Sequence, residues 1–128
     1  MVRKSALLFC LILAGLSVFQ LLLIFGAPLG HYAWGGQNEI LPTAFRIGSA
    51  VSLCIYAVFA LFMLQKAKII QVFKNQRLAS IGVWVVFGYS YIGILANAAS
   101  RSTGERNVMT PLIIIMTVLS FIVARSKT

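Results

Sequence analysis

Four long apolar runs constrain this chain more than any other feature of its sequence. They cover about residues 5–25, 47–65, 78–99 and 109–124, and none contains Asp, Glu, Lys, Arg or His. A helix of about 20 apolar residues crosses the hydrocarbon core of a bilayer. The first three runs have about that length and the fourth is near the lower limit. The chain is therefore predicted to be a multi-pass membrane protein.

The composition and the form of the runs define the class of membrane protein. Hydrophobic residues make up 60% of the 128 residues, more than a soluble domain of this size can bury. The runs are continuous, whereas the strands of a membrane β-barrel alternate between apolar and polar residues. Short connections make successive helices antiparallel neighbours. We therefore predict an all-α, antiparallel up-down four-helix transmembrane bundle that forms one domain over residues 1–128.

The charged residues lie between the runs and are distributed unequally. The net charge is +9, but the cations flank the spans, so we expect no nucleic acid as a partner. Cytoplasmic segments of membrane proteins carry an excess of lysine and arginine. Both termini and the 66–77 loop are thus predicted to be cytoplasmic, because eight of the 11 cations lie there: Arg3, Lys4, Lys66, Lys68, Lys74, Arg77, Arg125 and Lys127.

Two kinds of partner follow from these patterns. Membrane lipids are expected to place anionic headgroups near Lys66, Lys68, Lys74 and Arg77; docking of a cytoplasmic protein is the alternative. Small and polar residues share one face of the third run at Gly82, Tyr89, Gly93 and Asn97. Such a face lets helices approach closely in lipid, either within the molecule, which is the simpler interpretation, or in a homo-oligomer or a cavity wall.

The segment 26–46, on the predicted outer side, mixes turn-forming, apolar and polar residues. Gly26 and Pro28 end the first helix, and Gly35-Gly36 marks a tight turn. Trp34 is of the residue type that anchors at the membrane interface. Its apolar content predicts that the segment folds back over the mouth of the bundle.

Polar residues gather on the same outer side, and we take them as the candidate site. The candidates are His31, Trp34, Gln37, Glu39, Arg46, Asn97, Arg101 and Glu105. In the simpler interpretation ion pairs hold the loop to the bundle rim, with Glu39 near Arg46 and with Glu105 between Arg101 and Arg106. In the functional interpretation the set forms a polar pocket in which Arg46 or Arg101 faces an anionic group.

Several kinds of chemistry have no support in the sequence. Cys10 and Cys54 fall at different depths of their predicted helices and are not expected to form a disulfide. There is no CxxC motif and no Cys/His cluster, so we expect no metal and no cofactor. Ionisable residues inside spans mark proton and ion pathways. The predicted spans hold none, unlike the small multidrug exporters, which depend on a glutamate in the first span.

The 26–46 segment also carries a resemblance. The pattern G-A-P-x-G, A-W-G-G-Q, L-P and a following arginine spans Gly26–Gly30, Ala33–Gln37, Leu41-Pro42 and Arg46. It resembles a group of small bacterial four-span membrane proteins that have no assigned activity. The resemblance covers under a fifth of the chain. It implies a multi-pass protein of the bacterial plasma (inner) membrane and transfers no catalytic residue.

Three functions remain open, and the residues rank them. The first is a structural or accessory membrane protein. The second is a binder or carrier of a small or lipid-like molecule in a pocket under the 26–46 loop. The third is an intramembrane enzyme in which His31, Glu39 and Arg46 supply acid, base and anion stabiliser; nothing in their spacing requires this.

Overall fold

A computed structural model of the chain describes residues 1–100 and 102–127, apart from the side chain of His31. Four long helices account for most of it: α1 (Val2–Ile24), α2 (Thr43–Lys66), α3 (Gln76–Ala98) and α4 (Thr110–Ala124). Two short 3-10 turns, η1 (Gly30–Tyr32) and η2 (Trp34–Gly36), join α1 to α2, and a π-helical turn, η3 (Glu105–Met109), leads into α4. These described residues form no strand, which confirms the all-helical prediction.

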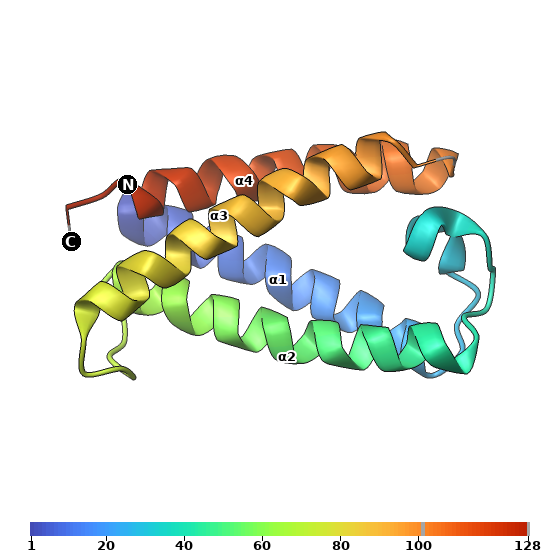
Figure 1. Cartoon of the computed structure of the whole chain (residues 1–128), viewed down its shortest axis with the longest axis horizontal. Helices are drawn as coiled ribbons and strands as arrows, with labels where there is room; N and C mark the ends of the chain where they lie inside the picture. Colours follow the sequence, from blue (N-terminus) through green and yellow to red (C-terminus); the bar gives the residue numbers. More distant parts are fainter. Residues whose placement is uncertain (101, 128) are drawn as a thin grey trace.

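The helices alternate in direction and form two hairpins, α1–α2 and α3–α4 (Figure 1). Both chain ends and the α2–α3 connection lie at one end of the bundle, which we call the termini end. The 26–46 segment and the α3–α4 connection lie at the other, which we call the loop end (Figure 1). Four helices in the described part are long and apolar enough to cross a membrane. Which end faces the cytoplasm stays a prediction.

The observed helices extend beyond the predicted runs. α2 begins at Thr43 directly after Pro42, and η3 with α4 forms a continuous candidate span of 20 residues from Glu105 to Ala124. The four apolar runs hold no ionisable residue, but the helical spans that contain them also include charged residues near their ends: Arg3, Lys4, Arg46, Lys66, Arg77, Glu105 and Arg106. Helices continue past the apolar core because their ends reach the interface, where polar side chains are tolerated.

A tightly packed core occupies the half of the bundle next to the termini end. Its members come from all four helices and include Phe9, Leu13, Phe59, Met63, Val83, Val86, Met116 and Val123. The approach of α2 to α3 depends on Gly82, because a Cβ there would lie 2.5 Å from Cγ of Phe62. At this glycine the small-residue face packs within the molecule.

The basic loop at the termini end is organised by one buried side chain. Oε1 of Gln65 accepts from the backbone N–H groups of Val72 at 3.0 Å and Phe73 at 2.7 Å. Lys66 is also buried, and its Nζ donates to Oγ of Ser80 at 2.9 Å. Lys66 is thus turned toward α3, and its predicted contact with a headgroup stays a prediction. Three cations of the loop, Lys68, Lys74 and Arg77, are exposed, and their contact with lipid stays a prediction.

Candidate functional site

The 26–46 segment is closed on itself by backbone contacts. The N–H of Gly30 donates to the carbonyl of Glu39 at 2.8 Å, and a Cβ on Gly30 would collide with the carbonyl oxygen of Asn38. Only glycine fits where two stretches of backbone approach this closely. The segment therefore forms a compact cover rather than an extended loop.

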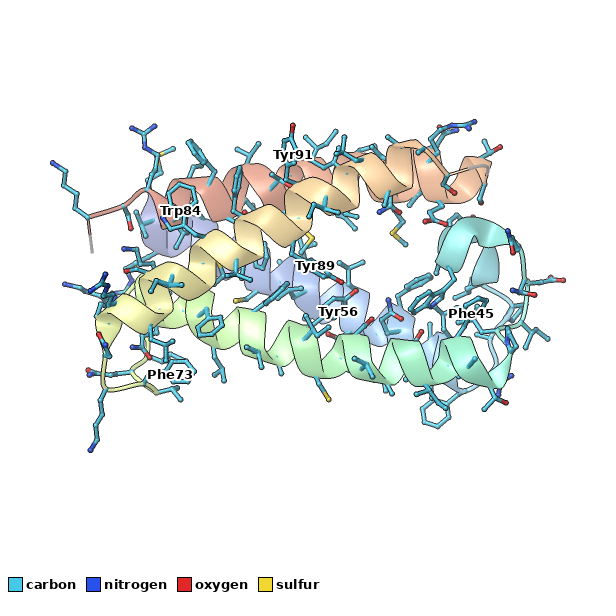
Figure 2. The ribbon with its side chains drawn as sticks, in the orientation of Figure 1. Phe45, Tyr56, Phe73, Trp84, Tyr89 and Tyr91 are labelled. Carbon is cyan, nitrogen blue, oxygen red and sulfur yellow. The ribbon has the colours of Figure 1, made fainter. Side chains whose placement is uncertain are left out.

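Trp34 fixes this cover to α2. Its Nε1 donates to Oγ of Ser49 at 3.2 Å, and its ring stacks on Phe45 with centroids 5.3 Å apart. Phe45 lies beneath the turns at the loop end of α2 (Figure 2). The backbone of Trp34 is left-handed, with φ of 52°, a conformation that is unfavourable for a bulky residue. The side-chain contacts hold it there, with the ring directly over Gly48.

A cavity of about 430 Å³ lies under the cover and is bounded by α1, α2, α3, η3 and α4. This volume falls in the range of small-molecule sites. Aromatic side chains form much of the wall: Phe19, Tyr32, Trp34, Tyr56 and Tyr89. Figure 2 shows Tyr56 and Tyr89 toward the middle of the bundle, between the two hairpins.

A second cavity, of about 60 Å³, adjoins the first toward the core. Both are lined by Tyr56 and Tyr89, and the smaller one is also lined by core residues such as Phe9 and Met116. The combined space is therefore apolar toward the middle of the bundle and more polar under the cover.

Glu105 is the charged residue among the described residues that line the cavity under the cover. It is 8% exposed, and its Oε2 is buried without a hydrogen-bond partner among the described residues. The neighbouring Arg106 is exposed, and its Nη1 donates to the carbonyl of Ser100 at 3.3 Å. A buried carboxylate is costly unless it is paired. The turn η3 thus holds a buried acceptor at the cavity wall, and π-helical turns of this kind are frequent at functional sites.

Asn97 is the second polar group in the wall. Its Nδ2 donates to the carbonyl of Gly93 one turn earlier at 2.8 Å, and within the described part of the chain its Oδ1 accepts no hydrogen bond. The amide is therefore oriented by its own helix and leaves an oxygen available to the cavity.

The structure separates the predicted site residues into three groups. Trp34, Asn97 and Glu105 meet at the cavity. Gln37 and Glu39 are exposed on the cover and do not line it. Two further predictions, the side chain of His31 and the whole of Arg101, lie outside the described residues.

Arg46 differs from the sequence predictions in two ways: it does not line the cavity, and it does not pair with Glu39 in the described structure. Its Nε donates to the carbonyl of Leu41 at 2.7 Å, and its guanidinium lies beside Gly26, so it holds the 26–46 segment together and does not face the cavity. The predicted ion pair between Glu39 and Arg46 is absent from these described residues, and so is one between Glu105 and Arg106. Each of these arginines instead donates one hydrogen bond to a backbone carbonyl.

Sequence reasoning missed Tyr56 and its pairing with Gln20, and it did not bring Tyr32 and Tyr89 together. Nε2 of Gln20 in α1 donates to the hydroxyl of Tyr56 in α2 at 3.3 Å, while Oε1 of Gln20 is buried without a partner in the described structure. Gln20 is conspicuous as a polar residue in an apolar run. Its partner Tyr56 could not be predicted from the sequence, because the register between two helices is set by tertiary packing.

The described polar groups of the cavity wall are the carboxylate of Glu105, the amide of Asn97 and the polar atoms of the tyrosine and tryptophan side chains. Over residues 1–100 and 102–127, outside the His31 side chain, no group of three or more His, Cys, Asp and Glu residues could hold a metal ion. No protein-family model, curated protein or solved structure matches this chain. Its function therefore has to be argued from the geometry of the cavity.

Proposed function

We propose that this membrane protein binds or carries a small amphiphilic molecule in the loop-end cavity. The observation that carries the proposal is the buried Oε2 of Glu105, which has no partner among the described residues and lies at the wall of a cavity of about 430 Å³. Buried polar groups in folded proteins are nearly always hydrogen-bonded. A bound molecule that reaches Glu105 would satisfy this group, and its apolar part would lie against the aromatic wall.

This proposal prefers the second of the three functions that the sequence left open. A purely structural bundle would be more stable with the cavity filled and the carboxylate replaced by an apolar side chain. An enzyme built on Glu39 and Arg46 has no support in the geometry, because neither residue lines the cavity.

The proposed orientation places the loop end outside. The exposed Lys68, Lys74 and Arg77 at the termini end support a cytoplasmic location for that end. With the resemblance of the 26–46 segment to small bacterial membrane proteins, this suggests a plasma (inner) membrane protein that takes its ligand from the outer side.

Native mass spectrometry of the full chain in mild detergent tests the proposal, with identification of any molecule that co-purifies. Glu105→Gln removes the charge without changing the size of the side chain. Glu39→Gln is the matched control, because Glu39 is the only other acidic residue and is exposed away from the cavity. We expect a stoichiometric small molecule with the wild type and Glu39→Gln and its loss with Glu105→Gln.

The thermal stability of the ligand-free variants provides a second readout. Glu105→Gln should be at least as stable as the wild type, because it removes an unpaired buried charge. A wild-type protein that carries only scattered lipid, or a ligand retained by Glu105→Gln, would contradict the proposal and return the structural role to first place.

A further inference from the structure

We infer that the loop-end cavity selects a cationic amine with an apolar body. The inference rests on the proposed function and names the chemical class of its ligand. It follows from three properties of the wall: its charge, its hydrogen-bonding groups and its aromatic rings.

The charge of the wall is opposite to that of the chain. Among the described residues that line the cavity, Glu105 is the only charged one, although the chain as a whole carries a net charge of +9. Of the described arginines, Arg106 directly follows the lining residue Glu105 and Arg46 lies at the start of α2, and both donate to backbone carbonyls instead. An anionic ligand would meet the Glu105 carboxylate with no described lining cation to balance the repulsion, whereas a cation would compensate it.

The hydrogen-bonding groups of the wall favour a donor as ligand. Oε2 of Glu105 and Oδ1 of Asn97 accept no bond in the described part of the structure. The N–H of Trp34 is already engaged by Ser49. A protonated amine offers three donors and no acceptor, so it complements these two oxygens. A carboxylate or phosphate would bring acceptors to them and would find donors at the tyrosine hydroxyls of the wall instead.

The aromatic side chains add a second attraction for a cation. Tyr32, Trp34, Tyr56 and Tyr89 surround the same space as Glu105. The faces of such rings attract cations, more strongly when water is excluded. The apolar body of the ligand would extend toward the smaller cavity of about 60 Å³ beside the core residues Phe9 and Met116. The head under the cover and the body toward the core together define the ligand.

Three probes with the same tail and different heads test the inference: hexylammonium, hexanol and hexanoate. The full chain is reconstituted in nanodiscs at neutral pH with Trp84→Phe, so that fluorescence reports Trp34 in the cavity wall. Trp84 lies on α3 and is not among the lining residues. We expect hexylammonium to bind at least tenfold more tightly than either other probe.

The variants separate the role of Glu105 from general attraction to the membrane. Glu105→Gln should abolish the preference for hexylammonium, and Glu39→Gln, which removes the same charge from the exposed cover, should retain it. A preference that survives Glu105→Gln overturns the inference.

The same data distinguish failure of the ligand class from failure of the proposed function. Equal binding of the three probes, or a preference for hexanoate, overturns the inference that the ligand is a cationic amine. Either result is still compatible with the proposed binding function. Absence of binding by all three overturns the class as well. The proposed function fails with it only if native mass spectrometry also shows no ligand that depends on Glu105.

Discussion

The two halves of this bundle use the same four helices differently. Toward the termini end, side chains from every helix interlock in one core, and Gly82 lets α2 and α3 approach closely. Toward the loop end the hairpins separate (Figure 1), and the space between them is a covered cavity of about 430 Å³. In lipid, helices associate through packing and interhelical hydrogen bonds. The termini half is therefore closely packed, and the loop half leaves a cavity, which we propose as a binding site.

The two halves also differ in whether their buried polar side chains have hydrogen-bond partners. At the termini end Gln65 and Lys66 are buried with hydrogen-bond partners in the adjoining loop and in α3. At the loop end Glu105 is buried with an oxygen that lacks a partner in the described structure. Burial with partners stabilises a fold, whereas burial without them suggests a group reserved for a ligand.

The largest expected effect compares two phenylalanines of α1. Phe9 is fully buried in the core, whereas Phe19 is partly exposed at the cavity wall. Phe9→Ala leaves a new void and should lower the free energy of unfolding by up to about 3–5 kcal/mol. Phe19→Ala only enlarges existing space and should cost clearly less. Unfolding of the reconstituted protein at increasing concentrations of denaturing detergent measures the loss of stability in each variant. Equal losses for Phe9→Ala and Phe19→Ala would contradict the difference in packing between the two halves.

A smaller effect, of opposite sign at two positions, is expected in α3. A Cβ at Gly82 would lie 2.5–2.6 Å from three ring atoms of Phe62, whereas nothing lies within 4 Å of a Cβ at Gly88. Gly82→Ala should destabilise by about 1–3 kcal/mol through overpacking, and Gly88→Ala should stabilise by up to about 1 kcal/mol through helix propensity. Thermal unfolding of the two variants measures the difference. A neutral Gly82→Ala would show that α2 and α3 adapt and that this half is less rigid than its packing indicates.

The smallest effect on stability is expected where the cover meets α2. A Cβ at Gly48 would lie 2.7 Å from Cη2 of Trp34, so Gly48→Ala should displace the ring. The gain in helix propensity, up to about 1 kcal/mol, offsets part of the cost. Quenching of Trp34 fluorescence by acrylamide in a Trp84→Phe background should therefore increase while overall stability changes little. Gly15→Ala, which has open space around it, is the control and should leave quenching unchanged.

The sequence by itself determined the class of the fold. Hydropathy and length are local quantities, so four apolar runs were sufficient to predict four helices. A local signal also placed the tight turn at Gly35-Gly36. The charge pattern predicts an orientation, but it does not say where any single charged side chain points.

Only the tertiary structure decided which polar residues meet. The sequence left open whether Glu105 pairs with neighbouring arginines or joins a polar pocket, whereas η3 makes it part of the fourth candidate span and places it at the cavity. Arg46 bonds within its own segment, and the cavity tyrosines come from separate helices. The direction of a side chain depends on helix register and on how the hairpins cross. Both are set by packing across the whole bundle, which no local stretch of sequence encodes.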